Sequence, residues 1–384
     1  MNNFSYYNPT RIVFGQDSIA ELKNLIQPEQ RVLMTYGGGS IKRNGVHAQV
    51  MKALAGHEVR EFGGIQPNPA YETLMQAVAL ARREKIDLLL AVGGGSVLDG
   101  TKFIAAAICY QGADPWEILT QQAPVKKALP LGSVLTLPAT GSEMNAFAVI
   151  SRTSTNEKLA FCSEHVYPRF AVLDPKTTMS LPPKQTRNGV VDAWVHVMEQ
   201  YATYPVDAAM QDRQAEAVLL ALRDEGPKVL ARPHDYDARA NVMWCATQAL
   251  NGLLGCGVPQ DWATHMIGHE LTAFYGIDHA ESLAVVLPAL WRHEKKRKAG
   301  KLEQYARRVW NETAADSQVA IEAGIARTVA FFESLGMKTH LADYGISPAE
   351  AAERIGDRFA QRGTRLGEHG DLTADQVATI LRQC

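Results

Sequence analysis

The sequence lacks the features that mark secreted, disulfide-rich and membrane proteins. It contains no C-x-x-C pair, and its five cysteines are an odd number, which argues against a disulfide framework or a thiolate zinc knuckle and favours a reducing compartment. No apolar run approaches the ~18 residues that a membrane span requires, and the N-terminal residues have no apolar stretch typical of a signal peptide. We therefore expect a cytoplasmic protein with no membrane partner.

The sequence also lacks an excess of charge of either sign. It has 39 basic and 41 acidic side chains, so its net charge is −2. This balance gives no overall electrostatic reason to expect binding to nucleic acid or to an anionic membrane. The one basic run, at 292–298, is typical of the solvated face of a helix in such a chain. Small molecules are the expected partners.

The composition is that of a folded globular protein. Hydrophobic residues make up 46 % of the chain and charged residues 21 %. A length of 384 residues corresponds to two or three domains at a typical ~150 residues each. These values exclude a disordered, fibrous or very small protein.

The first 180 residues have the pattern of an α/β fold. Short apolar runs without polar alternation are separated by helix-like stretches, as expected for strands buried on both faces of a mostly parallel sheet. The predicted strands are 11–14, 31–36, 87–92, 133–137 and 170–174.

From Leu181 onward the pattern is helical, with no convincing strand. The long amphipathic segments are 186–204, 208–223, 237–252, 262–275 and 316–335. The prolines at 181–183 disfavour continuation of the preceding element and suit the first turn of a helix. We predict an α/β domain at residues 1–180 and an all-helical domain at residues 181–384. Because no flexible linker separates them, we expect the two domains to enclose a cleft for a small molecule.

Two glycine-rich turns each follow a predicted strand and precede a predicted helix. They consist of Gly37, Gly38, Gly39 and Ser40 in the first turn, and of Gly93, Gly94, Gly95 and Ser96 in the second. Glycine lets backbone N–H groups approach an anion, and the following helix N-terminus favours phosphate. Lys42 and Leu98 stand where G-x-G-x-x-G would have its third glycine, so the strict dinucleotide fingerprint is absent. Such turns are common, but two of them after buried strands favour a phosphate site.

The first turn carries no acid that would accept a hydrogen bond from a ribose 2′-OH. The segment 36–40 reads Tyr-Gly-Gly-Gly-Ser, and Lys42 follows. An acid there would repel a 2′-phosphate, whereas a cation would attract it. If a nicotinamide cofactor binds, the absence of an acid from this turn favours NADP(H).

A metal-binding set is present in the helical half. Asp192 and His196 are four residues apart, which places a carboxylate and an imidazole on one helix face. His265, His269 and His279 follow, and three imidazoles with one carboxylate suit Zn²⁺ or Fe²⁺. Each residue alone is more often structural, but polar groups in apolar, aromatic-rich helices must be paired or coordinated. The protease pattern H-E-x-x-H is not matched.

Collinear motifs along nearly the whole chain resemble the iron-containing (group III) alcohol dehydrogenases, and most closely their bacterial NADPH-dependent aldehyde reductase, or butanol dehydrogenase-like, branch. The matching segments are FGGIQPNPAYETL, LLLAVGGGSVLDGTKFIAAA, LTLPATGSE, NGVVDAWVHVMEQY, ANVMWCATQALNG and GVPQDWATHMIGHELTA.

The resemblance implies a dehydroquinate synthase-like fold, with a nucleotide-binding domain before a helical metal-binding domain and the active site between them. It places one divalent ion on Asp192, His196, His265 and His279, and gives catalytic roles to His269, beside the nicotinamide, and to Asp99, pointing into the cleft. It assigns the adenosine end of NADP(H) to Gly37–Ser40, and the pyrophosphate to Gly93–Ser96. The rest of the cofactor groove is assigned to Thr136, Thr140, Ser142 and Lys158.

The implied activity is metal-dependent, NADPH-linked reduction of short-chain and aromatic aldehydes to primary alcohols by a homodimer. Two departures from the family pattern bear on loop geometry and substrate range: Asp278-His279-Ala280 replaces a common Pro-His-Gly, and the bulky Phe147 stands where relatives carry small residues. The alternatives are a polyol dehydrogenase or a dehydroquinate synthase-like lyase of the same fold, a metal-dependent hydrolase, and a non-catalytic nucleotide-binding protein.

Overall fold

The computed structural model describes residues 1–384, which form two compact units. The sheet unit contains Tyr7–Pro182 and Pro233–Thr247, and the helical unit contains Met1–Tyr6, Pro183–Arg232 and Gln248–Cys384. The domain boundaries expected from the sequence, 1–180 and 181–384, stay a prediction. In the structure, residues 1–6 group with the helical unit and residues 233–247 with the sheet unit.

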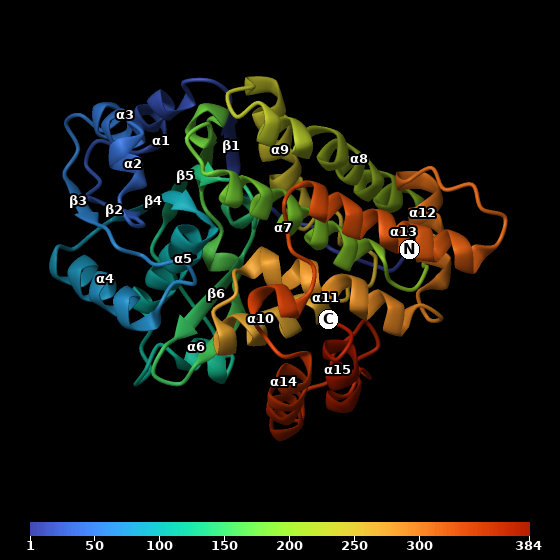
Figure 1. Cartoon of the computed structure of the whole chain (residues 1–384). Coiled ribbons are helices and arrows are strands. Elements are labelled where there is room, and N and C mark those ends of the chain that lie inside the picture. Colours follow the sequence, from blue (N-terminus) through green and yellow to red (C-terminus); the bar gives the residue numbers. More distant parts are fainter. The chain divides into compact units, whose positions relative to one another are not determined.

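The sheet unit is built on a six-stranded parallel sheet in the order β1-β8-β5-β4-β2-β3 (Figure 1). The strands of this sheet are β1 (Arg11–Phe14), β2 (Val32–Tyr36), β3 (Val59–Phe62), β4 (Leu88–Gly94), β5 (Leu131–Leu137) and β8 (Phe170–Leu173). All five predicted strands are therefore confirmed, as is the predicted parallel sheet.

Helices cover both faces of this sheet, which explains its uninterrupted apolar runs. Leu88, Leu90 and Val92 of β4 belong to one hydrophobic cluster with the helices of segment 18–54. Leu89 and Ala91, which alternate with them, belong to a second cluster with the helices of segment 71–109. Successive side chains of a strand point to opposite faces, so a strand buried on both sides must be apolar throughout.

The helices of the sheet unit are mostly short. They are α1 (Leu22–Leu25), α2 (Ser40–Arg43), α3 (Val46–Ala53), α4 (Tyr71–Arg83), α5 (Gly95–Cys109), α6 (Glu117–Thr120) and α9 (Tyr236–Ala249). The 3₁₀ turns are Ser18–Glu21, Ser142–Met144, Glu164–Val166 and Pro175–Thr178. An antiparallel hairpin of β6 (Phe147–Arg152) and β7 (Glu157–Cys162) completes the unit.

The helical unit contains no named strand, as predicted from Leu181 onward. Its helices are α7 (Pro183–Tyr201), α8 (Ala209–Ala231), α10 (Ala263–Tyr275), α11 (His279–Glu294), α12 (Ala299–Val309), α13 (Ser317–Ser334), α14 (Pro348–Arg362) and α15 (Ala374–Leu381), with a 3₁₀ turn at Leu341–Tyr344. At its centre, Trp194 of α7 is fully buried among the rings of Tyr305, Trp310, Phe331 and Phe332. This aromatic core fixes α7, which also carries Asp192 and His196.

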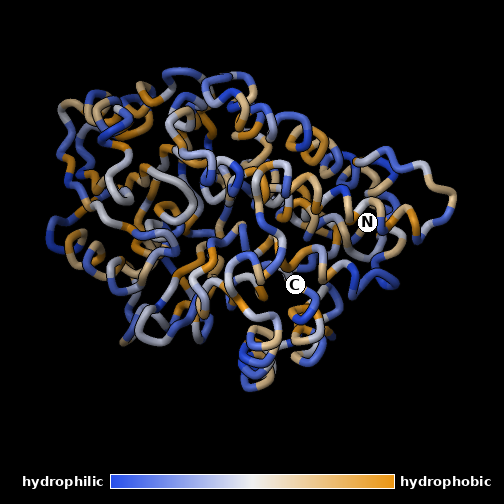
Figure 2. Tube along the Cα trace, viewed as in Figure 1, coloured by the Kyte–Doolittle hydropathy of each residue, from blue (hydrophilic) through white to orange (hydrophobic).

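Hydrophobic and hydrophilic positions are mixed along the long helices (Figure 2). None of the helices has the length and apolar character needed to cross a membrane.

The basic run at 292–298 is exposed or partly exposed, as expected, except at its last residue. Helix α11 ends within it, at Glu294, and Lys298 at its end is 2 % exposed. The Lys298 ammonium pairs with Asp261 at 2.8 Å and with Glu368 at 2.6 Å. Its burial could not be foreseen because both carboxylates are distant in sequence.

Candidate functional site

Three helices of the helical unit bring the predicted metal ligands together. Asp192 and His196 lie one turn apart on α7, His265 lies in the first turn of α10, and His279 is the first residue of α11. Asp192, His196 and His265 are at least nine-tenths buried.

One carboxylate oxygen lies at the centre of this cluster. The Oδ1 atom of Asp192 is 3.5 Å from the Nε2 atom of His279, 3.8 Å from that of His196 and 3.9 Å from that of His265. These distances are too long for hydrogen bonds, and this buried oxygen has no hydrogen-bond partner. Ligands about 2.1 Å from one ion at tetrahedral angles lie about 3.4 Å apart. Ligand atoms of Asp192, His265 and His279 all lie within 4.8 Å of one another, so these three residues form a possible site for a divalent ion, with His196 next to it.

A glycine allows the helices that carry these histidines to approach closely. A Cβ atom on Gly268, in α10, would lie 2.7 Å from the Ser282 Oγ atom and 3.0 Å from a Leu283 methyl carbon, both in α11. A larger residue would therefore push α10 away from α11. This contact holds His265 and His279 within reach of one ion.

The α10–α11 loop is tied to α7 by Asp278, one of the departures from the family pattern. Its carboxylate pairs with Lys184 at 2.7 Å and accepts a hydrogen bond from Asn188 at 3.4 Å. The pKa of Lys184 is raised, mainly by the hydrogen bond to Asp278. Asp278 thus anchors the residue preceding His279.

His269 lies beside the cluster, one turn after His265. Its ring centroid is 5.3 Å from that of His279 and 6.3 Å from that of His265. The side chain is 7 % exposed. The structure therefore places an additional imidazole next to the predicted ligands.

Glu199, which the sequence analysis did not single out, contacts His265 directly. One carboxylate oxygen accepts the hydrogen bond of the His265 backbone N–H at 3.2 Å, and the other contacts the His265 Nδ1 atom. Burial, and then the negative charge of Asp261, raise the pKa of Glu199 well above its usual range. Glu199 follows His196 by three residues, and this spacing indicates that the two share a helix face. The spacing does not indicate the contact of Glu199 with α10.

The two glycine-rich turns of the sheet unit meet at one side chain. A Cβ atom on Gly93 would lie 2.5 Å from Val97, and one on Gly37 would lie 3.7 Å from the same residue. Gly39 has a φ of +86°, a region that glycine adopts without strain, and open space surrounds it. Glycine is therefore required at Gly93 by packing and is favoured at Gly39 by backbone geometry.

The second turn leads directly into α5, whose first N–H groups receive no side-chain cap. An uncapped N-terminus of a helix this long is a favourable position for phosphate. Gly94 and Gly95 also pack against the third predicted segment, because added Cβ atoms would lie 2.9 Å from Leu137 and 2.5 Å from Thr140. The structure thus brings the turn 93–96 beside the segment 136–142, which contains Thr136 at the end of β5.

Asp99, in α5, holds this segment in place. One of its oxygens accepts a hydrogen bond from the Ser142 hydroxyl at 2.6 Å, and the other accepts one from the Val149 backbone N–H at 2.9 Å. Burial raises the pKa of Asp99, whereas the positive charges of Lys102 and, more weakly, Lys158 lower it. Both oxygens of Asp99 are therefore used within the sheet unit.

An acid does lie near the first glycine-rich turn, although the sequence analysis found none. Glu61 of β3 pairs with Lys42 at 3.2 Å and His47 at 3.1 Å, and accepts a hydrogen bond from the Tyr36 hydroxyl at 3.1 Å. Burial raises the pKa of Glu61, but the bonds from His47, Lys42 and Tyr36 outweigh it and hold the pKa below its usual value. This acid was missed because it comes from the next strand, which was not predicted.

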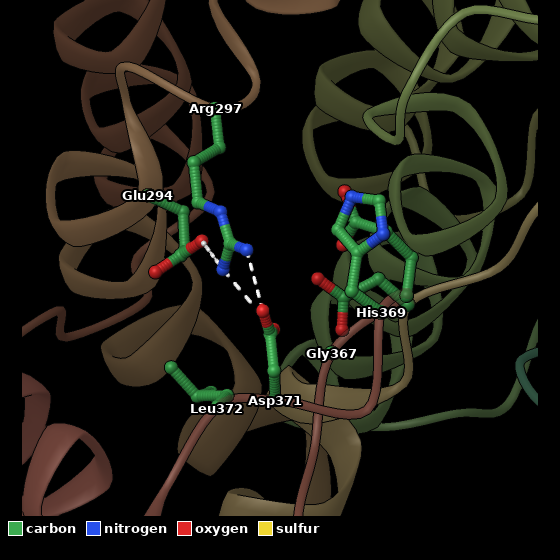
Figure 3. A pocket seen from close by; sticks show the side chains of 8 residues that line it. Glu294, Arg297, Gly367, His369, Asp371 and Leu372 are labelled. Carbon is green, nitrogen blue, oxygen red and sulfur yellow. Dashed lines mark hydrogen bonds and ion pairs between the residues drawn. The ribbon is translucent and has the colours of Figure 1, made fainter.

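A separate polar pocket in the helical unit is shown in Figure 3. It is lined by Asp261, Glu294, Arg297, Gly367, Glu368, His369, Asp371 and Leu372. Arg297 pairs with Glu294 at 3.4 Å and with Asp371 at 2.5 Å, so its charge is compensated inside the pocket. None of the predicted site residues lines this pocket.

Comparisons with known proteins match both parts of the chain to one family. Residues 9–175 match the family described as iron-containing alcohol dehydrogenase, and residues 186–384 match the C-terminal part of the Fe-containing alcohol dehydrogenase family. The chain is 60 % identical over 377 residues to the NADPH-dependent aldehyde reductase YqhD of Escherichia coli, covering 98 % of this chain and 97 % of that protein. It is 42 % identical over 388 residues to a probable NADH-dependent butanol dehydrogenase of Bacillus subtilis, covering 100 % and 99 %.

Solved structures of related proteins also match over the whole chain. The crystal structure of E. coli YqhD matches with a TM-score of 0.98 at 58 % identity, covering 100 % of this chain and 99 % of that one. The structure of an NADH-dependent butanol dehydrogenase from Thermotoga maritima matches with a TM-score of 0.95 at 35 % identity, covering 100 % and 98 %.

Proposed function

Because this chain belongs to the iron-containing alcohol dehydrogenase family, we propose that it reduces short-chain and aromatic aldehydes to primary alcohols with NADPH, using one bound divalent ion. The observation that carries the proposal is the buried Asp192 oxygen surrounded by three imidazole nitrogens at 3.5–3.9 Å. The identity of 60 % to an NADPH-dependent aldehyde reductase supports the choice of cofactor and reaction direction.

Asp192, His196, His265 and His279 hold the ion, which is Zn²⁺ or Fe²⁺. When bound, the ion supplies Lewis acidity toward an aldehyde carbonyl, and NADPH supplies the hydride. The protein ligands contribute one negative charge and three neutral nitrogens, so a divalent ion keeps a net positive charge there. Such a site favours a substrate oxygen on which negative charge develops during reduction.

His269 and Asp99 have different roles in this proposal. His269 lies 5.3 Å from His279 between ring centroids and can hold or deliver the proton that the product alcohol needs. Asp99 uses both oxygens to bind Ser142 and Val149, and so acts as a positioning residue for the cofactor groove.

The NADP(H) groove is formed by the residues predicted from the sequence. Gly37, Gly38, Gly39 and Ser40 receive the adenosine end, and Gly93, Gly94, Gly95 and Ser96 receive the pyrophosphate at the uncapped N-terminus of α5. Thr136, Thr140, Ser142 and Lys158 line the remainder. The mutual packing of Gly95 and Thr140 supports a single continuous groove.

The function is tested by following NADPH absorbance with a panel of aldehydes before and after chelation of metal. We expect steady oxidation of NADPH with butanal and benzaldehyde, and its loss after chelation. Activity that survives complete metal removal would contradict the proposal, and hydrolysis without NADPH would favour a hydrolase.

Cofactor preference should depend on the acid at position 61. Glu61→Gln removes the partner of Lys42 and should increase the preference for NADPH, because Lys42 becomes free to meet a 2′-phosphate. Gly39→Asp should shift the preference toward NADH by roughly tenfold, or about 1.4 kcal/mol. Asp tolerates positive φ better than most residues, and the space there is open.

The measurement is the ratio of kcat/KM for NADPH and NADH. Glu58→Gln is a matched control, since Glu58 is an exposed acid beside β3 that pairs with Arg60. A Gly39→Asp variant with unchanged cofactor preference would show that the 2′ end of the cofactor lies elsewhere.

Substrate chain length should matter because an aromatic side chain, Trp262, lies beside the proposed metal ligands. The Trp262 ring centroid is 6.2 Å from that of His196 and 5.3 Å from that of His265. Each added methylene that is buried contributes ~0.8 kcal/mol, so kcat/KM should rise about fourfold per carbon from acetaldehyde to butanal. Trp262→Ala should flatten this profile, and an unchanged slope in that variant would remove Trp262 from the substrate pocket.

The chain acts as a cytoplasmic homodimer in this proposal. Strand β1 is an edge of the sheet, and edge strands offer unpaired backbone groups to a partner. Phe14, the last residue of β1, and Trp244 of α9 are 41 % and 42 % exposed and pack edge to face on each other. No two of the five cysteines are joined by a disulfide, which supports a reducing compartment. Light scattering should give twice the chain mass for the wild type and a monomer for Phe14→Lys, and a monomeric wild type would contradict this part.

A further inference from the structure

Glu199 connects the two helices that carry three of the four proposed metal ligands. It lies on α7, three residues after His196 and seven after Asp192, so it shares their helix face. Its carboxylate, only 3 % exposed, reaches α10 and contacts His265 twice, at the backbone N–H and at the imidazole Nδ1.

The contact at Nδ1 determines how the His265 ring can be used. When Nε2 binds an ion, the neutral ring carries its hydrogen on Nδ1, and the Glu199 oxygen at that atom is placed to accept it. That Nε2 atom faces the Asp192 Oδ1 atom at 3.9 Å. A carboxylate behind a ligating histidine also fixes the ring orientation and makes the imidazole a stronger donor.

The end of α7 that carries Glu199 is joined to its surroundings by a buried network. The Glu199 backbone carbonyl accepts a hydrogen bond from the Asp261 backbone N–H at 2.8 Å. The Asp261 side chain in turn caps Ala263 at the start of α10 at 2.9 Å, and pairs with the buried Lys298 at 2.8 Å. Lys298 also donates to the Ala202 carbonyl at 2.8 Å, just past the end of α7. The backbone at Glu199 is therefore tied to the start of α10 and to the segment that follows α11.

From this geometry we infer that Glu199 is a positioning residue that orients His265 and sets the affinity of the site for its divalent ion. The inference rests on the proposed metal site and assigns a role to a residue outside the four ligands. If Glu199 only capped α10, its replacement would lower the free energy of unfolding. The metal affinity of the folded protein would then stay unchanged.

The test is the Co²⁺ affinity of the metal-stripped full chain, measured by competition with a chromogenic chelator. The wild type should bind one Co²⁺ per chain, and failure to do so would contradict the proposed function rather than this inference. Glu199→Gln keeps one acceptor oxygen and replaces the other with an amide nitrogen. The variant should bind Co²⁺ about 10–100-fold more weakly. Binding as tight as in the wild type would overturn the inference.

Glu216→Gln is a matched control. Glu216 is 4 % exposed in the same unit and pairs with Arg213 and Arg308 and with the Tyr201 hydroxyl, without touching a proposed ligand. Its loss should lower the melting temperature while leaving Co²⁺ affinity unchanged. Equal losses of affinity in both variants would show a general weakening of the unit and overturn the inference.

Two further measurements separate action through His265 from other effects. In a His265→Ala background, Glu199→Gln should cause no additional loss of Co²⁺ affinity, and an additional loss would overturn the inference. If Glu199→Gln does not fold, the contact is tested in the Co²⁺-loaded wild-type protein instead. Its paramagnetically shifted NMR spectrum should contain a slowly exchanging imidazole N–H signal that is absent in His265→Ala, and absence of that signal from the wild type would contradict the contact.

Discussion

Replacement of His265 by alanine is expected to reduce aldehyde reduction to the background rate and to lower the bound metal, while the fold survives. The remaining side chains would leave one coordination position to water, and Asp192 would face only two imidazoles. The removed ring is 7 % exposed and lies at a polar cluster rather than in the aromatic core around Trp194, so the loss of packing should be tolerated.

The measurement combines metal content, NADPH oxidation with butanal, and circular dichroism of the same sample. His293→Ala is a suitable control because His293 lies near the end of α11, beside Glu294 and away from the proposed ligands. It should retain both metal and activity. A His265→Ala protein that keeps full activity without bound metal would contradict the assigned site.

Replacement of Gly268 by alanine is the second change from which we expect a large effect. Alanine normally stabilises a helix by up to about 1 kcal/mol relative to glycine. Here the new methyl group would lie 2.7 Å from the Ser282 Oγ atom, which donates a hydrogen bond to the His279 carbonyl at 2.6 Å. Overpacking of this kind typically costs about 1–3 kcal/mol, and the displacement would separate His265 from His279.

The matched control is Gly300→Ala, in α12 of the same unit, where an added Cβ meets nothing within 4 Å. Thermal unfolding should show Gly300→Ala slightly stabilised and Gly268→Ala destabilised. Metal titration should show weaker binding only in Gly268→Ala. If Gly268→Ala binds metal as tightly as Gly300→Ala, the close crossing of α10 and α11 does not set the site.

The sequence was sufficient for elements whose pattern is set by burial alone. The runs at 31–36 and 87–92 are apolar throughout because helices cover both faces of the sheet, and both became strands. The helices around Asp192 and His265 were also predicted, and the separation of four residues between Asp192 and His196 placed both on one face.

The features missed from the sequence depend on contacts between distant segments. Strand β3 reads Val-Arg-Glu-Phe and lies at the sheet edge, where its charged side chains are exposed, so no apolar run revealed it. Because β3 was not predicted, Glu61 was missed as well. Its partners Lys42 and His47 precede it by more than ten residues. Helix α11 (His279–Glu294) was not predicted, and Pro288 inside it is a residue that disfavours a helix interior.

Glu199 shows the same limitation within the candidate site. Its partner His265 is 66 residues away, and only the crossing of α7 and α10 brings the two together. Residue spacing identifies ligands that share a helix, but it does not identify the side chain that orients a ligand from another helix.

The most direct test of the account is a metal titration of the stripped protein, followed by NADPH oxidation with butanal. We expect activity to rise in proportion to added Zn²⁺ or Fe²⁺ and to stop rising at one ion per chain, with Asp192→Ala giving no response. Full activity in the stripped wild-type protein, or an equal response in Asp192→Ala, would contradict the account.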